Sequence, residues 1–580
     1  MSHRSFFTIA ILLVLSISGS AQSQEPAPAA GPDERAALKK SALDLLTSVA
    51  GQVDTLRSAE NRARIGSNAA EALWDHDEKR ARTLFAAVGQ DIRTGFADAD
   101  PEPETHKHTL LVFWQLRSDT VARIAKHDPE LAIEFLRATR LPEDERLPYQ
   151  SSDTEEAMEL RLAAQAAAKN PELAARLGRE SLEQGFSSDL LSVLSTLQSK
   201  DKTAAQGFYQ AIVDKLKTAD LVQDTMATHF AFMLAQKFEP PQADERVYRE
   251  LIGILLSSAL ANGCGKAQSD ESSSICYEIA PLYPKFEGYY GRRAVSLKSW
   301  TQENSEDGPA SPAWWEQINE LNEKGTLDEI LAFVEKNPDS KYQLSYAAVR
   351  KAEAAGDFAR ARQIATDLAG EYPRKSLLEQ IAADEKKSLV NPEDPASVQQ
   401  MLSTFRTNDQ RLEFLVEMAV RISGKNRRAA FDLLGQGRQI VDSLKPGRMQ
   451  FAAQIGLAMF YSFLKSNRGF EIMETLMPKL NELVTASAAL DGFEHNYLSD
   501  GEWNMTGEGT VGALLTALSQ NVGYFAWLDF DRSVTLAGQL ERPELRLMAQ
   551  LKIAQSVLGE PPSLAAIFQP RSQVESRYVE

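Results

Sequence analysis

Three glycines near the C-terminus have the spacing of a dinucleotide-binding fingerprint. Gly507, Gly509 and Gly512 spell G-x-G-x-x-G and lead into the apolar stretch GALLTAL. A dinucleotide site needs a buried strand directly before these glycines, because strand, turn and helix together aim backbone N–H groups at the pyrophosphate. The preceding residues, YLSDGEWNMT, do not have the pattern of such a strand. We therefore expect no dinucleotide cofactor at this position.

Other signatures of catalysis or metal binding are missing from the sequence. It has no G-x-S-x-G nucleophile elbow, no H-E-x-x-H zinc helix and no P-loop. His106 and His108 could share a metal ion only on an extended strand, because residues two apart diverge on a helix. The sequence therefore favours a protein without catalytic activity, cofactor or metal ion.

The chain has two cysteines, Cys264 and Cys276, which flank the polar segment GKAQSDESSSI. A zinc site would need two more ligands, and no Cys or His stands nearby. In an oxidising compartment, a flexible loop would bring two such close thiols together. We predict a disulfide between them that pins a surface loop and contributes about 3 kcal/mol to stability.

Two irregular segments carry side chains that suit ligand binding. In residues 281–312, aromatic rings stand beside guanidinium groups, a combination that binds sugars or carboxylates. In residues 491–512, an indole ring could stack on a sugar beside acidic groups. The candidate partner-binding residues are Tyr289, Tyr290, Arg292, Arg293 and Trp503. The alternatives are that the first group covers a junction between two helical arrays and that the second lies in an ordinary polar loop.

The elements that must position these residues are helices. Apolar residues first recur at helical spacing at Leu38, Ala42, Leu45, Leu46 and Val49. Many intervening positions hold Ala, Glu, Arg, Lys or Gln, which enter helices at low cost, and strand-like alternation is scarce. The sequence predicts an all-α fold.

A short pattern recurs along the chain: Asp or Asn, then Ala four residues later and a large apolar residue seven later. Asp or Asn can accept hydrogen bonds from the first turn of a helix, and Ala permits a neighbouring helix to approach closely. Each occurrence therefore predicts the start of the second helix of a hairpin. The six occurrences are Asp77/Ala81/Leu84, Asp128/Ala132/Phe135, Asn170/Ala174/Leu177, Asp201/Ala205/Phe208, Asp357/Ala361/Ile364 and Asn426/Ala430/Leu433.

One of these occurrences lies in the segment GDFARARQIATDLAGEYP, Gly356 to Pro373. Gly356 and Asp357 stand at an inter-helix turn, Ala361 at a small packing position and Pro373 at a helix end. This segment resembles the second half of a tetratricopeptide repeat. The resemblance implies an α-solenoid of stacked, tetratricopeptide-like helical hairpins with irregular repeats, whose concave surface binds a protein or peptide.

The N-terminus has the parts of an export signal. His3 and Arg4 precede an apolar run from Phe6 to Ile17, and small residues follow up to Ala21. The run would span about 18 Å as a helix, less than the roughly 30 Å of a bilayer core, so an uncleaved anchor is the less favoured alternative. We predict cleavage near Ala21 and a periplasmic or secreted protein.

These features divide the chain into segments. We predict a signal peptide at 1–21, a Pro/Ala linker at 22–35 and a first helical-repeat array at 36–280. A junction follows at 281–312, and a second array extends over 313–560 with a loop insertion at 491–512. Residues 561–580 form a polar tail.

The net charge of −18 repels phosphate backbones and anionic lipids, so nucleic acid is not an expected partner. We predict an exported, monomeric helical-repeat scaffold that binds a protein or peptide and spans no membrane. The inferred superstructure also resembles that of soluble lytic transglycosylases, but the G-L-M-Q string of their catalytic domain is absent. The alternative is a cell-wall or glycan-processing accessory protein or cryptic hydrolase, which Trp314, Trp315 and Trp503 suggest.

Overall fold

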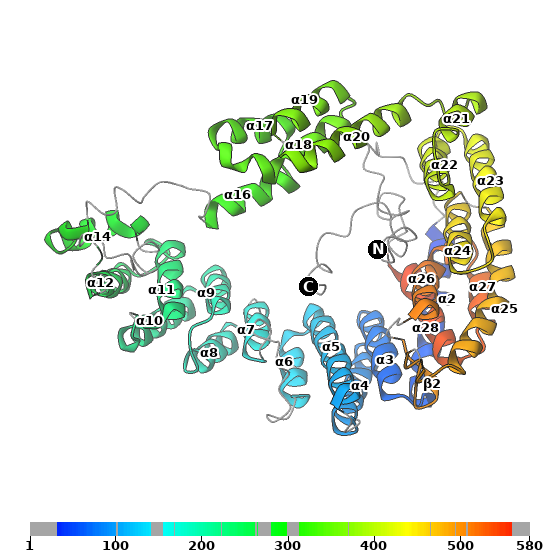
Figure 1. The fold of residues 1–580 in the computed structure, drawn as a ribbon. Coiled ribbons are helices and arrows are strands. Elements are labelled where there is room, and N and C mark those ends of the chain that lie inside the picture. Colours follow the sequence, from blue (N-terminus) through cyan, green and yellow to red (C-terminus); the bar gives the residue numbers. More distant parts are fainter. Residues whose placement is uncertain are drawn as a thin grey trace. The chain divides into compact units, whose positions relative to one another are not determined.

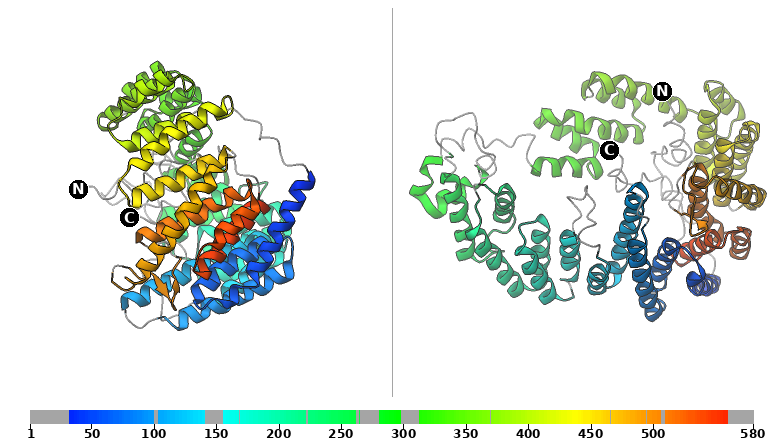
Figure 2. Two further views of the ribbon diagram at one scale, coloured as in Figure 1. Left: turned by 90° about the vertical axis from the view of Figure 1, so that its right-hand side faces the viewer. Right: turned by 60° about the horizontal axis from the view of Figure 1, so that its bottom comes forward.

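The computed structural model of the chain is built almost wholly of helices, as Figures 1 and 2 show, which confirms the predicted all-α fold. It describes residues 32–99, 103–140, 155–167, 169–221, 223–261, 264, 280–297, 312–368, 370–464, 466–493, 495–505 and 509–559. The chain forms two compact units. Unit 1 combines Met1–Asp75 with Gly308–Glu580, and unit 2 is the intervening stretch His76–Asp307.

Unit 2 is a row of helices in which most helices pack on their neighbours in sequence. Its elements are α4 (Glu78–Ala97), α5 (Pro103–His127), α6 (Pro129–Ala138), α7 (Glu155–Ala166), α8 (Pro171–Leu182), α9 (Ser188–Lys200), α10 (Lys202–Thr218), α11 (Thr225–Lys237), α12 (Glu245–Ala261), η3 (Ala280–Leu282), α14 (Tyr283–Tyr290), η4 (Gly291–Arg293) and η5 (Val295–Leu297). This succession is that of an α-solenoid.

Unit 1 begins with elements from the start of the chain and continues with the second half. Its elements are α2 (Pro32–Ala50), η1 (Val53–Thr55), α3 (Ala59–Leu73), α16 (Pro312–Glu323), α17 (Leu327–Lys336), η6 (Pro338–Ser340), α18 (Lys341–Ala354), α19 (Phe358–Leu368), α20 (Glu371–Ser388), α21 (Pro395–Leu402), α22 (Asn408–Ser423), α23 (Arg427–Ser443), α24 (Arg448–Phe463), α25 (Arg468–Ala488), β1 (Leu498–Ser499), β2 (Glu502–Trp503), α26 (Gly509–Ala526), α27 (Phe530–Gly538) and α28 (Pro543–Leu558). The described part of the chain contains no helix with both the length and the apolar character needed to cross a bilayer.

All six predicted helix starts are confirmed. In each, the Asp or Asn side chain accepts a hydrogen bond from a backbone N–H of the first turn, as when Asp201 accepts from Ala204 at 3.0 Å. The alanine four residues later is buried every time. The large apolar residue is buried in five cases; at the first occurrence Leu84 is half-buried and the adjacent Phe85 is buried instead.

The tetratricopeptide-like segment forms the turn between α18 and α19 and the whole of α19. Gly356 has a φ of +76°, a left-handed conformation that favours glycine, and Ala361 is fully buried. The prediction for Pro373 was wrong, because α19 ends at Leu368 and Pro373 lies in the first turn of α20. A proline is tolerated there because the first N–H groups of a helix have no intrahelical acceptor.

Three apolar cores follow one another through unit 1. The first lies among α16 to α20, the second among α21 to α24, and the third among α24 to α28. The third core also contains Ala42 of α2, with Leu38 and Leu45 packed against it. Figure 1 shows α2 lying against α28, so residues from both ends of the chain share one core.

This arrangement adds a feature that the sequence analysis did not include. Residues 36–75 were placed in the first array, whereas their helices pack with the last helices of the second half. The predicted signal peptide, most of the Pro/Ala linker, the polar tail and Cys276 lie outside the described residues. The disulfide and the export signal therefore remain predictions.

Candidate functional site

A chain of ion pairs links three helices of unit 1. Arg350 of α18 lies 3.1 Å from Glu353 of the same helix and 3.5 Å from Asp384 of α20. On α20, Lys387 lies 3.9 Å from Asp384, and its ammonium group is 3.2 Å from Glu417 of α22. Helices α18, α20 and α22 are therefore joined by a continuous row of alternating charges.

Burial and charge together perturb the pKa values in this row. Burial raises the pKa of Glu417, and the opposing effect of Lys387 does not offset it. Burial likewise raises the pKa of Glu353, although Arg350 acts in the opposite direction. For Lys387, burial alone lowers the pKa, but the nearby carboxylates of Glu417, Glu413 and Asp384 together raise it. Burial is thus the larger effect on the two glutamates, and neighbouring carboxylates are the larger effect on the lysine.

Two exposed tyrosines lie on α18 before this row. Tyr342 is 70% exposed and Tyr346 is 55% exposed, whereas Leu344 and Ala348 between and after them are fully buried. Residues four apart share one side of a helix, so Tyr342, Tyr346 and Arg350 form a single stripe. Large exposed aromatic side chains in such a stripe are typical of surfaces that contact another molecule.

An apolar groove runs between α22 and α24, with α23 beneath it. The groove has a volume of about 50 Å³, a second space has a volume of about 10 Å³, and Phe460 lines both. Apolar side chains from all three helices line the groove, among them Leu412, Val416, Ile440, Met449, Ala453 and Phe460. A Cβ atom added to Gly456 would meet no atom within 4 Å, so the glycine leaves the middle of the groove open.

Three acidic side chains lie along α22, and the first of them borders this groove. Asp409 lines the groove, and Glu413 and Glu417 follow at intervals of four residues on the same side of the helix. Glu417 pairs with Lys387 of α20, and the charge of Glu413 also acts on that lysine, whereas Asp409 has no ion-pair partner among the described residues. The tyrosine stripe, the ion-pair row, this acidic row and the groove make up what we call the α18–α24 surface.

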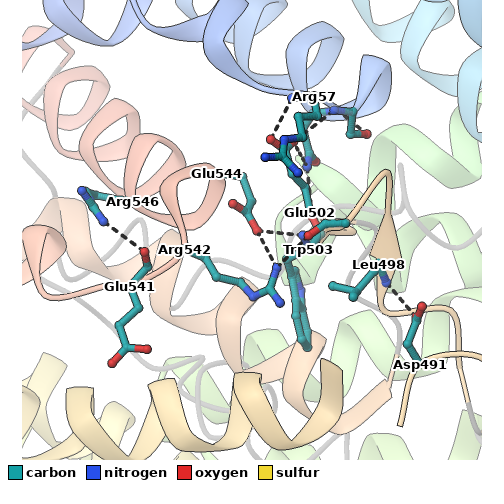
Figure 3. A network of polar contacts seen from close by, with 12 residues as sticks. Arg57, Asp491, Leu498, Glu502, Trp503, Glu541, Arg542, Glu544 and Arg546 are labelled. Atoms are coloured by element: carbon teal, nitrogen blue, oxygen red, sulfur yellow. Dashed lines mark hydrogen bonds and ion pairs between the residues drawn. The ribbon is translucent and has the colours of Figure 1, made fainter. Parts of the chain in front are cut away.

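A second cluster of polar groups is buried where residues 57–61 meet residues 502–544 (Figure 3). The Glu502 carboxylate accepts hydrogen bonds from the backbone N–H groups of Arg57 at 2.7 Å and Ser58 at 3.2 Å. It also accepts from the Asn61 side chain at 3.2 Å. Because Ser58 is the N-cap of α3, Glu502 completes the start of that helix from 441 or more residues away in the sequence.

The neighbouring residue extends this cluster toward α28. The backbone N–H of Trp503 donates to Glu544 at 2.7 Å, and Arg542 lies 3.4 Å from the same carboxylate (Figure 3). The Trp503 side chain is 1% exposed and packs beside Tyr497. We call the contacts of α2, η1 and α3 with residues 491–505 and α28 the clasp.

Within the clasp, the Trp503 side chain is part of the core rather than of an exposed binding surface. An indole that is 1% exposed has no open ring face on which a sugar could stack. The predicted loop 491–512 instead contains a short antiparallel hairpin, in which Asp500 and Gly501 form the turn with φ values of 52° and 77°. Both central residues have positive φ, as in the two-residue turns that suit the twist of paired strands.

The other candidate partner-binding residues lie in unit 2, against α12. The Tyr290 hydroxyl donates to the backbone carbonyl of Arg249 at 2.7 Å, and the Arg249 guanidinium lies 5.4 Å from the Tyr289 ring. Arg293 lies 5.8 Å from the Tyr290 ring, and Arg292 is exposed. The two tyrosines thus cover the last long helix of this array, and a binding role for the four residues remains a prediction.

The glycine motif and the histidine pair, which the sequence analysis rejected as a cofactor site and a metal site, lie in structural elements that fit neither role. Gly509 begins α26, and the residues before it form the antiparallel hairpin rather than a strand of a parallel sheet. His106 and His108 lie in α5, where residues two apart point to different sides. Within the described ranges, no three His, Cys, Asp or Glu side chains form a group suited to a metal ion.

The sequence analysis missed the α18–α24 surface. A helical wheel of residues 341–354 separates Tyr342 and Tyr346 from the apolar stripe of Leu344, Ala348 and Val349, and would have flagged them. The ion-pair row and the groove depend on which helices become neighbours, and no local pattern indicates that.

Comparisons with known proteins give little further information. The sequence matches no protein-family model and no curated protein. One solved structure with similarity is a "Circular tandem repeat protein with novel repeat topology and enhanced subunit contact surfaces". It is 12% identical, the alignment covers 90% of this chain and 98% of that chain, and the TM-score is 0.14.

Proposed function

We propose that the protein is an exported helical-repeat scaffold that binds a protein or peptide partner through the α18–α24 surface. The observation that carries this proposal is the apolar groove between α22 and α24, which stays open although three helices meet there. Binding sites are usually concave and apolar, with a few polar side chains among those that line them. Asn408 and Asp409 are such polar side chains in this groove. The exposed Tyr342 and Tyr346 extend the same surface.

A substitution that fills the groove tests this proposal. Gly456→Leu places a side chain in the open space, and leucine also enters a helix about 0.8 kcal/mol more favourably than glycine. Gly435→Leu is the matched control, because Gly435 of α23 also has no atom within 4 Å of an added Cβ and does not line the groove. Circular dichroism should show the same helix content in all three proteins.

The experiment is a pull-down from a cell-envelope extract with quantitative mass spectrometry. We expect a partner that is retained by the wild-type protein and by Gly435→Leu, and reduced at least about tenfold by Gly456→Leu. Recovery of no partner above the bead control, or equal recovery with all three proteins, would contradict the proposal.

No described side chain favours the alternative, a glycan-processing role; the Trp315 side chain lies outside the described ones. Trp503 and Trp314 are 1% and 6% exposed, so neither presents a ring to a sugar in this structure. Incubation of the protein with peptidoglycan and chromatography of the products separates the two roles, because released fragments would favour a hydrolase.

A further inference from the structure

We infer that unit 1 consists of two bodies that turn relative to each other about a polar hinge at residues 382–390. The first body is α16–α20, and the second is α21–α28 together with α2 and α3. The inference goes beyond the proposed function and does not depend on it, because it rests only on contacts within unit 1. Three observations lead to it: a break between two apolar cores, a helix end without buried apolar side chains, and polar links across the joint.

The first and second apolar cores of unit 1 are separate. Among the described side chains, no buried or half-buried apolar residue belongs to both. The second and third cores are instead joined through α24, because Leu457 lies in the second and Ile455 in the third, and Ile472 of α25 packs against both. Helix α20 packs closely on α19, whereas neither α21 nor α22 packs closely on α20. The break in apolar packing therefore falls directly after α20.

The last two turns of α20 carry no buried apolar side chain. Ile381 is the last residue of α20 in the first core, and residues 382–389 are all half-buried or exposed, with Leu389 79% exposed. Val390, which follows them, is buried in the second core. Residues 382–389 thus lead from one core to the other without an apolar side chain buried in either. A segment with so few buried apolar contacts opens at a low cost in free energy.

Ion pairs hold this helix end on the first body. Asp384 lies 3.5 Å from Arg350 of α18. Glu385 accepts two hydrogen bonds from Arg362 of α19, one of them at 3.3 Å. Helix α20 therefore stays fixed to α18 and α19 up to Glu385, and rotation is left to the residues that follow.

The links from α20 to the second body are also polar. Lys387 lies 3.2 Å from Glu417 of α22, and Arg421 of the same helix donates to the carbonyl oxygens of Lys387 at 3.3 Å and Val390 at 2.8 Å. The Lys387 and Glu417 side chains are 19% and 21% exposed, so water and salt reach the pair. Such links weaken as ionic strength rises, whereas apolar packing does not.

The hinge divides the α18–α24 surface. Tyr342 and Tyr346 lie on α18 of the first body, and the groove between α22 and α24 lies on the second. A partner that contacts both parts would hold the hinge at one angle, so the rotation would affect which partners fit. This consequence for a partner rests on the proposed function, whereas the hinge itself does not.

Double electron–electron resonance between two spin labels in the full-length chain tests the inference. Cys264 and Cys276 are first changed to serine, so that labels attach only to introduced cysteines. The pair Ala359→Cys and Gln439→Cys joins α19 of the first body to α23 of the second. The control pair, Gln439→Cys and Lys479→Cys, lies within the second body. All three labelled positions are exposed, so the labels disturb no core.

We expect the distance distribution between the two bodies to be at least about twice as broad as that of the control pair, because a hinge adds motion that a shared core prevents. It should broaden further at about 1 M salt, where the screening length falls to about 3 Å. The control distribution should not change with salt.

Two variants should change the hinge in opposite directions. Glu417→Gln removes the carboxylate that pairs with Lys387, although Asp384 and Glu413 remain near that lysine, and should broaden the distribution between the bodies. Lys387→Met combined with Glu417→Leu replaces the ion pair with apolar side chains, an exchange that is often neutral or stabilising. This double variant should narrow the distribution toward that of the control pair and remove its dependence on salt. Circular dichroism confirms that each variant is folded.

Three outcomes would overturn the inference. The first is a distribution between the bodies as narrow as that of the control pair at both salt concentrations. The second is broadening by both variants, which would indicate general loosening rather than a polar hinge. The third is no change with either variant. None of these measurements involves a partner, so the hinge can fail while the scaffold role stands, and recovery of no partner leaves the hinge intact.

Discussion

The clasp and the α18–α24 surface use the same kinds of side chains in opposite ways. In the clasp, Trp503 and Glu544 are each 1% exposed, and Glu502 is satisfied by backbone N–H groups of another segment. On the α18–α24 surface, Tyr342 and Tyr346 remain more than half exposed. The comparison shows that an aromatic ring beside carboxylates is no evidence for a binding site when another segment of the same chain covers it.

The largest expected effect tests the clasp. Trp503→Ala removes a fully buried indole and should lower the free energy of unfolding by about 3–5 kcal/mol. Phe493→Ala is a matched control in the same segment, because Phe493 is 84% exposed and its loss should change stability by less than about 0.5 kcal/mol. Urea denaturation measures both values. Similar values for the two variants would show that the clasp does not stabilise unit 1.

A second prediction concerns the pH dependence of stability at the ion-pair row. Since burial raises the pKa of Glu417, the folded protein holds a proton there at pH values where the unfolded chain has lost it. The folded state therefore gains stability as the pH falls from the raised pKa toward the unfolded value near 4.5 and loses it again as the pH rises.

Glu417→Gln removes this titration, so the wild-type protein should gain stability relative to the variant as the pH falls from 7 to about 4.5. Lys387→Met should have the opposite effect, because the loss of the positive charge raises the pKa of Glu417 further and steepens the gain. Urea denaturation across this pH range measures both changes. A difference between wild type and Glu417→Gln that is constant with pH would contradict the assignment.

The smallest expected effect concerns the exposed tyrosines of the α18–α24 surface. Tyr342→Ser and Tyr346→Ser, singly or together, should each change the free energy of unfolding by less than about 0.5 kcal/mol, because both rings are largely exposed. Thermal denaturation followed by circular dichroism tests this. A loss comparable to that of Trp503→Ala would mean that the tyrosines support the fold rather than a partner.

The features that could be predicted from the sequence are those set by nearby residues. Asp128 and Asn170 cap their helices because the acceptor and the donor N–H groups are three residues apart or fewer. Gly356 adopts positive φ at a turn where a side chain would be strained. Such contacts are independent of which helix later becomes a neighbour, so the all-α solenoid follows from local patterns.

The features that could not be predicted depend on distant residues. Glu502 and Arg57 are 445 residues apart, and nothing in either local sequence indicates that they meet. Lys387 and Glu417 are 30 residues apart, and they pair because α20 and α22 are neighbours. The turn at Asp500 and Gly501 is different, since an Asp-Gly pair is a known hairpin signal and could have been recognised.

The clasp joins helices that are synthesised at very different times, so unit 1 cannot complete its folding until the last of them is made. Its α3 meets α28 through contacts such as Asn68 with Gln555, which are 487 residues apart, and the whole of unit 2 is synthesised in between. At a typical rate of 5–20 residues per second, the apolar side of α2 waits roughly 25–100 s for its partner helix. A nascent chain that stops before α28 keeps that side uncovered, so the need for chaperones is longest at the first helix of the described residues rather than at the last.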